Sequence, residues 1–334
     1  MSKALVSVIS PCYNVAPYIG RYLDSLLSQT YKKLEIILVN DGSTDNTGDI
    51  IKSYIRRLEE QGYKVIYIEQ ENGGQSSAVN NALKLVTGKF FTWPDPDDWL
   101  TPDSIEKRVA FLQSHPDAGM VRSNVERIEE GTGRSLGFFE SRHSRPYPIK
   151  NAFEKLILCT TWFAPVGYMM RMDFFDKVVP NREIYVEKSA GQNWQLMLPM
   201  TLAYPLWQMP DVLGYYCVRT DSHSHKLNDL ESSLAYNKMN EDVLINTLNK
   251  IKAPSVFVEL VRTEYLIWRF RMICLSLPKT KQWEHFRKTV TSLRRIKDKL
   301  RVCCLFVLPC FVWKKTSIIK KSFRRIYRLI HHEI

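Results

Sequence analysis

The sequence lacks the signatures of several large protein classes. Its seven cysteines include no C-x-x-C pair, and their odd number and spacing fit neither a metal site nor a disulfide framework. No apolar run approaches the roughly 20 residues that span a bilayer. The segment Ala4–Ile9 is too short for the core of a signal peptide and predicts a buried strand. These absences, with the lack of internal repeats, predict reduced thiols, a cytoplasmic location and an ordinary globular fold.

Positive charge is abundant but unevenly distributed. Apolar residues make up 45% of the 334 residues, which is enough to bury a sizeable core. The formal net charge is +12, and residues 291–334 carry ten of these charges, so the rest of the chain is nearly neutral. Nucleic-acid enzymes usually spread positive charge over the working domain, so we expect no nucleic-acid partner. A basic tail on a neutral body predicts an anionic partner for the tail alone.

The first 125 residues alternate between two patterns. Short apolar runs predict strands at Ala4–Ser10, Glu35–Asn40, Val65–Glu69, Phe90–Trp93 and Gly119–Ser123. The segments between them place apolar residues three or four positions apart, as helices do. The order βαβαβαβαβ predicts an α/β fold with a doubly wound, mostly parallel sheet. Residues 126–225 are rich in aromatics and prolines and are expected to complete the sheet, and residues 226–300 to form a helical extension.

Polar clusters follow three strands of this predicted sheet. They are Pro11–Asn14, Asn40–Asp45 and Asp95–Asp98. Ligands of open parallel sheets bind beyond the carboxyl ends of the strands. We therefore expect the three clusters to border one binding site.

The second cluster contains Asp41 in the run N-D-G-S-T-D-N. A carboxylate at the end of a strand can accept two hydrogen bonds, for example from the base or ribose of a nucleoside. Pro11 and Tyr13 would give that base an apolar wall. The alternative is that Asp41, like Asp45, is a turn or helix-cap residue.

The third cluster places three carboxylates, Asp95, Asp97 and Asp98, in four positions after an apolar strand. Like charges this close raise one another's pKa unless a cation neutralises them. Oxygen ligands suit Mg²⁺ or Mn²⁺, which keep several waters and bridge to phosphates. Asp95 and Asp97 are therefore predicted to bind Mg²⁺ or Mn²⁺. The alternative is a solvated acidic turn in which Asp98 or Asp103 caps a helix.

These motifs together resemble the family 2 glycosyltransferases. The matching segments are S-V-I-S-P-C-Y-N at 7–14, S-L-L-S-Q-T-Y at 25–31, E-I-I-L-V-N-D-G-S-T-D-N-T at 35–47, N-G-G-Q-S-S-A-V-N-N-A-L at 72–83 and D-P-D-D at 95–98. The resemblance covers residues 5–125 and extends weakly to 225. It implies a Rossmann-like nucleotide-diphospho-sugar transferase fold over residues 1–225, in which 1–125 bind a nucleotide sugar and 126–225 face the acceptor.

The resemblance also implies roles for single residues. Pro11, Tyr13 and Asp41 would contact the nucleoside, with Asn14 beside them at the donor. Asp95 would contact the donor diphosphate as well as the metal ion. Members of the family mostly invert the anomeric centre, with a carboxylate base that deprotonates the acceptor hydroxyl.

The sequence departs from the family where that base is expected. The family often has Glu-Asp before an aromatic-rich helix, but this chain has Gln192 and Asn193, and an amide cannot take a proton. Glu187, the nearest upstream carboxylate, is the predicted base, and Asp98 is the alternative. Trp194 is expected to support an acceptor sugar, although a tryptophan packed in the core fits the pattern equally well.

A polar segment at 219–225, R-T-D-S-H-S-H, resembles a loop that closes this domain in many relatives. Arg219 would pair with the diphosphate of the donor. His223 or His225 would contact the metal ion or a phosphate. The alternative is an exposed polar loop without a ligand.

The resemblance implies transfer of a sugar from a nucleotide-diphosphate donor to a lipid-linked or polysaccharide acceptor in cell-surface glycan synthesis. Two other functions are open. A nucleotidyltransferase is less favoured, because P-C-Y-N replaces the usual glycine-rich, basic phosphate loop after the first strand. The other is a catalytically silent scaffold that binds nucleotide sugars. The amide of Asn193 favours it, because an amide cannot act as the base, whereas the retained D-P-D-D argues against a silent scaffold.

The last 34 residues predict contact with a membrane. Val302–Trp313 is an apolar run of twelve residues that contains Pro309, and basic residues interleaved with apolar ones follow it. This pattern is typical of a helix that lies in the interface of an anionic membrane without crossing it. Residues 301–334 are therefore predicted to hold the protein peripherally on the cytosolic membrane face. The alternative is a helix packed on the catalytic domain.

Truncation after Leu300 tests this prediction. We expect the shortened protein to leave the membrane fraction and to keep its activity on a soluble acceptor analogue. Each basic residue near an anionic surface contributes about 1 kcal/mol to binding, and the apolar face adds a part that salt does not weaken. Co-sedimentation of both proteins with anionic and neutral vesicles measures the effect. Equal vesicle binding by the two proteins would place the anchor elsewhere, and a shortened protein that does not fold would make the tail a packing element.

Overall fold

The structure is a computed structural model that describes residues 3–219 except 142, residues 229–276 and a few positions between 284 and 299. The described chain divides into two compact units. Residues 3–219 and 242–257 belong to the first unit, and residues 229–241 and 258–276 to the second. The predicted membrane-associating tail, 301–334, lies outside the described residues.

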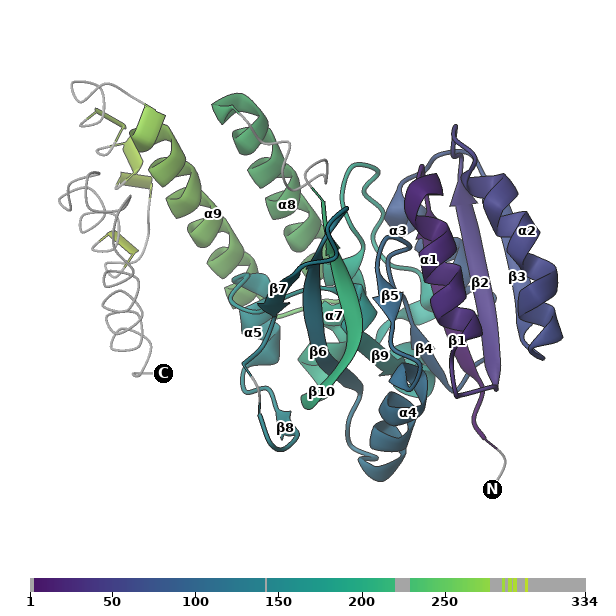
Figure 1. Ribbon diagram of the computed structural model, residues 1–334. Coiled ribbons are helices and arrows are strands. Elements are labelled where there is room, and N and C mark those ends of the chain that lie inside the picture. The colour runs from purple at the N-terminus through teal and green to yellow at the C-terminus, as the bar shows by residue number, and fades with distance from the viewer. Residues whose placement is uncertain are drawn as a thin grey trace. The chain divides into compact units, whose positions relative to one another are not determined.

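The first unit is built on one large mixed sheet (Figure 1). Its strands lie in the order β3-β2-β1-β4-β9-β6-β10-β5, with β7 beside β6 and β8 beside β10. The bounds are β1 Val6–Cys12, β2 Leu34–Asp41, β3 Lys64–Gln70, β4 Phe90–Thr92, β5 Trp99–Leu100, β6 Met120–Glu129, β7 Ser135–Phe138, β8 Tyr147–Pro148, β9 Tyr168–Arg171 and β10 Leu206–Val218.

The first four strands confirm the predicted parallel half of the sheet. β1 pairs in parallel with β2 on one side and β4 on the other, and β2 pairs in parallel with β3. Every residue of β1 and β2 is buried, as expected for parallel strands that helices cover on both faces. The fifth predicted strand, β6, does not lie next to β4. The antiparallel strand β9 lies between them and pairs with both.

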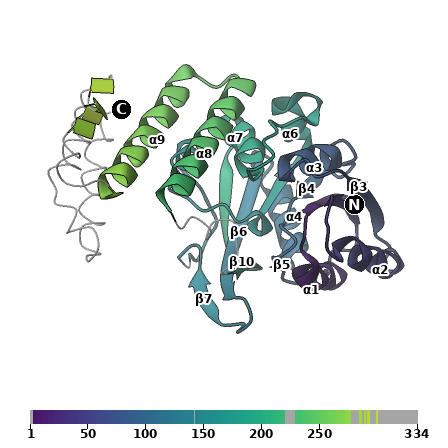
Figure 2. The same cartoon turned by 90° about the horizontal axis from the view of Figure 1, so that it is seen from above.

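Helices cover both faces of this sheet. Seen from above, α1 and α2 lie on one side of the parallel strands and α3 on the other (Figure 2). The helices are α1 Ala16–Leu27, α2 Thr47–Glu60, α3 Gln75–Leu83, α4 Ser104–Ser114, α5 Ala152–Ile157, α6 Met172–Val178, α7 Asn193–Ala203, α8 Leu230–Lys250 and α9 Ser255–Ser276, with short 3₁₀ turns at Pro165–Gly167 and Pro180–Arg182. No helix in the described ranges is both long enough and apolar enough to cross a bilayer.

The main core lies between the sheet and the α1 side. Ile19, Leu23 and Leu26 of α1 are fully buried there, and they belong to the same cluster as Val8 of β1 and Ile36 of β2. The three helical residues are spaced three or four positions apart, which is the periodicity that predicted the helix. This core fixes α1 against β1, so the first turn of α1 lies beside the carboxyl end of that strand.

A buried carboxylate fastens the opposite edge of the sheet. Glu35 of β2 accepts hydrogen bonds from Ser7 Oγ of β1 at 2.7 Å, Lys64 Nζ of β3 at 2.7 Å and Thr87 N, in the segment before β4, at 2.9 Å. Burial opposes ionisation of this side chain, but the hydrogen bonds from Lys64 and Thr87 hold the pKa of Glu35 below its ordinary value. Glu35 thereby links β1, β2, β3 and the segment before β4 at the end of the sheet that faces away from the polar clusters.

Candidate active site

The polar clusters that follow β1 and β2 meet directly. In the parallel pairing of these strands, Cys12 lies opposite Asn40. Beyond them, Asn14 N donates to Ser43 Oγ at 3.1 Å, and Asn14 Oδ1 accepts from Thr44 N at 2.8 Å. Asn14 has a φ of +50°, a left-handed conformation that asparagine tolerates better than most residues. This bridge confirms that the first two clusters border the same edge of the sheet.

The proposed nucleoside wall has one buried and one exposed member. Pro11 is the sixth residue of β1 and is buried opposite Val39. Tyr13, two residues later, is 44% exposed, which is unusual for a large apolar side chain of this unit. An exposed ring at the edge of a binding site is available to a ligand, but nucleoside contacts from Pro11, Tyr13 and Asn14 stay predictions.

Asp41, at the end of β2, holds the turn that begins α3. Its Oδ1 accepts hydrogen bonds from Gly73 N at 2.8 Å and Gln70 Nε2 at 2.7 Å, and its Oδ2 accepts from Gly74 N at 2.9 Å. Asp41 is only 2% exposed. The carboxylate therefore positions the glycine turn, as a turn residue would, and its contact with a nucleoside stays a prediction. Asp45 is a turn residue as well, since its Oδ1 accepts from Thr47 N at 3.0 Å.

The same glycine turn contacts the segment that carries Glu187. A side chain on Gly74 would come within 2.4 Å of Lys188 O, and Gly74 has a φ of +87°, so only glycine fits there. Ser76 Oγ accepts from Glu187 N at 3.1 Å and donates to Glu187 O at 3.2 Å. Glu187 is thus fixed beside the start of α3, half-buried, with Oε1 accepting from Ser189 N at 3.4 Å. Its role as a base stays a prediction.

The acidic cluster follows β4 and is held by residues distant in sequence. Asp98 is 1% exposed, and its Oδ1 accepts from Cys217 N of β10 at 2.9 Å. Its other oxygen, Oδ2, is buried without a hydrogen-bond partner in the described part of the chain. Asp97 Oδ2 forms an ion pair with Arg219 Nη2 at 3.3 Å. The solvated acidic turn that was the alternative does not describe Asp98, because this side chain is buried.

Burial and mutual repulsion raise the pKa values of these acids. Burial, followed by the charge of Asp97, raises the pKa of Asp95 to about 7, although Gln192 and Arg219 counteract the rise. Burial and the charges of Asp97 and Asp95 raise the pKa of Asp98 well above its ordinary value. Near neutral pH the cluster therefore retains protons that a bound cation would displace.

The amide pair lies at the acidic cluster, where the family often has a carboxylate. Gln192 precedes α7, is 1% exposed and donates from Nε2 to Asp95 Oδ1 at 3.3 Å. Asn193 begins α7, and its Oδ1 accepts from Trp93 Nε1 at 3.3 Å. The alignment of this segment with the family's Glu-Asp pair is thus consistent with the position of these two side chains.

Trp194 is half-buried and packs against other side chains of its unit. Its Nε1 donates to Leu156 O of α5 at 3.0 Å, and its ring meets Phe163 edge-on, with centroids 5.7 Å apart. These contacts resemble those of the alternative, a packed tryptophan, but the side chain is not fully buried. A role of Trp194 toward an acceptor sugar stays a prediction.

Two arginines approach the acidic loop, and only one of them was predicted. Arg219, which follows β10, pairs with Asp97 and lies over the ring of Tyr18 at 4.6 Å. Arg21 of α1 donates from Nη2 to the carbonyl oxygen of Asp97 at 3.2 Å. Tyr18 and Arg21 are three residues apart, about one helical turn, and Tyr18 comes four positions after Asn14, the last residue of P-C-Y-N; this spacing was the available sequence signal. His223 and His225 lie outside the described residues.

The acidic cluster fits a cation that also binds phosphate. Within the described ranges, no group of three or more His, Cys, Asp or Glu side chains is arranged to hold a metal ion. Mg²⁺ and Mn²⁺ need fewer protein ligands, because one or two carboxylates, waters and substrate phosphates complete their coordination. Asp95 and Asp97 supply two oxygen ligands whose repulsion a divalent cation would relieve.

The sequence matches a family model that agrees with this geometry. Residues 7–178, just over half of the chain, match Glycosyl transferase family 2. The chain belongs to this family. Its mixed sheet with helices on both faces is the nucleotide-diphospho-sugar transferase fold of this family.

Curated relatives of this chain are named glycosyltransferases. The chain is 46% identical over 154 residues to Glycosyltransferase GlyA of Streptococcus pneumoniae, which covers 45% of the chain and 21% of the relative. It is 36% identical over 130 residues to Glycosyltransferase GlyG of the same organism, covering 39% of the chain and 42% of the relative. The matches thus span a fifth to about two fifths of the length of these relatives.

Solved structures share the fold of this chain. S. aureus TarS 1–349 in complex with UDP-GlcNAc superposes with a TM-score of 0.58 at 21% identity, covering 90% of this chain and 83% of that one. The mannosyltransferase PcManGT from Pyrobaculum calidifontis, in complex with GDP-Man and Mn²⁺, gives a TM-score of 0.57 at 16% identity, covering 98% and 86%. At these identities the likeness shows the fold alone.

The raised pKa of Asp95 has a consequence for stability that can be measured in chelator. A carboxyl group whose pKa is raised by folding stabilises the fold fully below its ordinary pKa of 3.8, and this contribution is lost progressively as the pH rises from there through about 7. Asp95→Asn does not titrate. It should therefore raise the free energy of unfolding relative to wild type by roughly 1–3 kcal/mol at pH 8 and by less at pH 5. Urea unfolding at the two pH values measures this.

Asp103→Asn is the matched control. Asp103 Oδ2 lies 2.8 Å from Lys107 Nζ, and this hydrogen bond lowers the pKa of Asp103. Its loss should destabilise the protein slightly at pH 8, the opposite sign to Asp95→Asn. An equal gain at both pH values, or no gain at pH 8, would show that charge crowding does not strain the acidic cluster.

Proposed function

We propose that this glycosyltransferase binds a nucleotide-diphosphate sugar across the carboxyl ends of β1, β2 and β4. It transfers the sugar to a glycan or lipid-linked acceptor, with inversion, in cell-surface glycan synthesis. One observation carries the proposal. The acidic cluster at the end of β4 meets Arg219 from the end of β10, on the sheet edge where Asn14 joins the turn after Asp41. Ligands of open α/β sheets bind at this edge.

The nucleoside would lie over β1 and β2, and the diphosphate over β4. Tyr13 offers an exposed ring to a base, and Asp41 and its glycine turn border the same region. Two structures with this fold contain UDP-GlcNAc or GDP-Man, which supports a nucleotide sugar as the donor here. The carboxylates and Arg219 would face the diphosphate, since a positive side chain and a bound cation both attract phosphate oxygens.

Asp95 and Asp97 would hold Mg²⁺ or Mn²⁺. Such a cation offsets the negative charge that develops on a departing diphosphate. The structure of PcManGT with Mn²⁺ supports this assignment. Gln192 keeps Asp95 oriented through its amide, and Arg219 adds a second positive charge at Asp97. His223 remains a proposed additional ligand from the segment outside the described residues.

The acceptor needs a base that the amide pair cannot supply. Gln192 and Asn193 lie at the acidic cluster, and neither side chain can accept a proton. Glu187 is the proposed base, because its segment is fastened to the start of α3 beside the glycine turn. Asp98 is the alternative, since its Oδ2 is buried without a partner among the described residues.

A catalytically silent nucleotide-sugar binder is the second candidate function. The observation that favours it is the amide pair itself, since both side chains contact the site and neither is ionisable. Such a protein would bind the donor with metal and release no nucleotide. Turnover by the wild-type protein therefore separates the two functions. The proposed location on a membrane surface depends on the basic tail and is independent of this choice.

The metal assignment is tested by Asp97→Asn. We expect this variant to lose metal-stimulated release of nucleoside diphosphate from a panel of nucleotide sugars, because one of two proposed carboxylate ligands is gone. Asp103→Asn, a nearby exposed carboxylate that pairs with Lys107, should behave as wild type. Full turnover by Asp97→Asn, or by the wild type in excess chelator, contradicts the assignment.

The nucleoside contact of Asp41 is tested by Asp41→Ala. In a nucleotide-binding titration this variant should bind more weakly by about 1.5–3 kcal/mol, the contribution of hydrogen bonds that involve a charge. An unchanged affinity in a folded variant would limit Asp41 to its role in the turn.

The base is tested by Glu187→Gln. If Glu187 deprotonates the acceptor, transfer should fall by about 10²–10⁴-fold while donor binding survives. Glu183→Gln is the control, because Glu183 lies in the same segment and pairs with Lys250 at 3.4 Å at the surface. Near-normal transfer by Glu187→Gln would exclude it and favour Asp98.

A further inference from the structure

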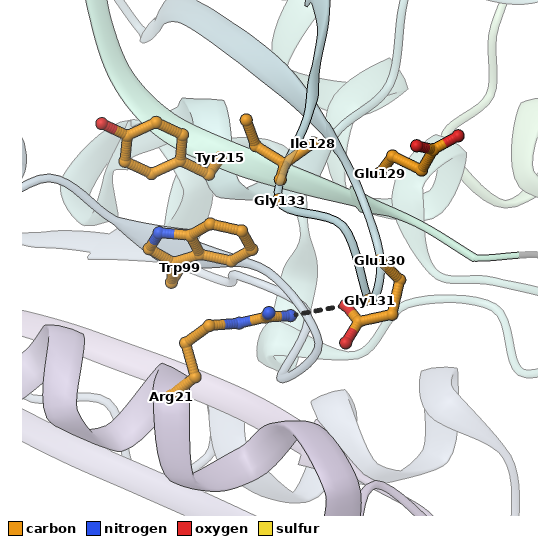
Figure 3. A pocket seen from close by; sticks show the side chains of 8 residues that line it. All are labelled: Arg21, Trp99, Ile128, Glu129, Glu130, Gly131, Gly133 and Tyr215. Carbon is orange, nitrogen blue, oxygen red and sulfur yellow. Dashed lines mark hydrogen bonds and ion pairs between the residues drawn. The ribbon is translucent and has the colours of Figure 1, made fainter.

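A second hollow opens on the α1 side of the acidic loop, with a volume of about 380 Å³ (Figure 3). Its lining comes from α1, β5, β10 and the turn between β6 and β7. We propose that this hollow binds a neutral carbohydrate, namely a sugar unit of the acceptor glycan some distance from the reacting hydroxyl. That the bound sugar belongs to an acceptor rests on the proposed function, whereas the binding of a sugar in this hollow can be tested independently of it.

One wall of the hollow is a stack of three side chains. Trp99 and Tyr215 lie opposite each other on the antiparallel strands β5 and β10, and their rings stack with centroids 5.1 Å apart. The guanidinium of Arg21 lies over the indole of Trp99, 4.0 Å from its centroid. All three side chains are half-buried. Because Trp99 lies between Tyr215 and Arg21, both of its faces are covered, and a sugar ring would contact the outer face of Tyr215 and the edge of the stack (Figure 3). Rigid aromatic surface of this kind contacts the C–H faces of a sugar ring at a low cost in conformational entropy.

The opposite wall is a glycine turn. Gly131 and Gly133 have φ values of +80° and +68°, and nothing lies within 4 Å of the position that a side chain would take at either residue. The positive φ values, and not close packing, favour glycine at these two positions. The turn carries no side chain at Gly131 and Gly133, which line the hollow together with Trp99 and Arg21 (Figure 3).

Two polar atoms of the stack, Trp99 Nε1 and Tyr215 Oη, and Oε1 of the neighbouring Glu130 take part in no hydrogen bond with the described residues, whereas Glu130 Oε2 accepts from Arg21 and Cys217. Trp99 Nε1 and Tyr215 Oη lie at the ends of their rings that are away from Glu130 (Figure 3). An indole N–H donates, a carboxylate accepts and a phenol does both. This set matches the alternating donors and acceptors of sugar hydroxyls.

The charges that line the hollow are already paired. Arg21 Nη2 lies 3.1 Å from Glu130 Oε2, and Glu129 pairs with Arg134 at 2.9 Å. The hollow therefore offers no surplus positive charge for a phosphate and no surplus negative charge for a cation. Aromatic surface with paired charges and open hydrogen-bonding atoms favours a neutral, polyhydroxylated ligand.

The hollow is connected to the acidic loop by direct contacts. Arg21 Nη2 binds both Glu130 and the carbonyl oxygen of Asp97. Cys217 donates from Sγ to Glu130 and from its backbone N to Asp98 Oδ1. A glycan whose end reaches the acidic cluster would thus find its next binding surface here, on the α1 side of the loop.

Binding of neutral oligosaccharides by the full chain tests the proposal. Wild type, Tyr215→Ala and Tyr204→Ala are incubated with an array of neutral oligosaccharides, and the oligosaccharides that bind wild type are titrated by calorimetry. Tyr204 stacks on Phe174 at 4.2 Å outside the hollow, so its variant loses a similar ring elsewhere. We expect Tyr215→Ala to weaken oligosaccharide binding at least tenfold and to leave UDP and GDP binding unchanged. Tyr204→Ala should bind as wild type does.

Kinetics give a second readout. Tyr215→Ala should raise KM for the acceptor oligosaccharide while kcat and the KM of the donor stay within about twofold, because lost uniform binding appears in KM. An array on which wild type binds no neutral oligosaccharide overturns the proposal, as does equal binding by wild type and Tyr215→Ala. If sugars bind through Tyr215 but no nucleotide sugar is bound or turned over, the hollow is a carbohydrate site and the proposed function fails instead.

Discussion

The crowding of three carboxylates in four positions after β4 is the constraint on which the site depends. Each acid is held by a partner from another part of the chain. Gln192 before α7 reaches Asp95, Arg219 after β10 reaches Asp97, and the backbone of β10 reaches Asp98. Buried like charges are tolerated only when such partners or a cation offset them. The acidic loop therefore fixes where α7 must begin and where β10 must end.

The parallel half of the sheet brings this loop to the same end of the sheet as Asp41 and Asn14. β1 pairs with both β2 and β4, so their carboxyl ends share one edge. Two carboxylates of β2 act at opposite ends of that strand. Glu35 fastens the far edge, and Asp41 holds the glycine turn that starts α3. Because both are buried and fully hydrogen-bonded, they specify one register and one turn, which keeps the site in a single geometry.

The start of α7 has two amides where the resemblance to the family implied a carboxylate pair. An acid at position 192 would add a fourth negative charge next to Asp95, whereas the amide of Gln192 donates a hydrogen bond to it. Gln192 therefore adds no repulsion to the cluster, and Glu187 and Asp98 remain the proposed bases. Arg21 of α1 also positions the acidic loop, because it donates a hydrogen bond to the carbonyl oxygen of Asp97 and stacks on Trp99.

The sequence alone determined the parallel βα half, the family and the three clusters, because strand and helix periodicity and turn residues are local signals. It also placed Asp95, Asp97 and Arg219 at one site through the family's spacing. It did not predict β9, whose antiparallel insertion between β4 and β6 depends on pairing across distant segments. Nor did it predict the contact of Arg21 with the acidic loop or the burial of Asp98. Only tertiary packing decides which charged group loses contact with water and which distant group becomes its partner.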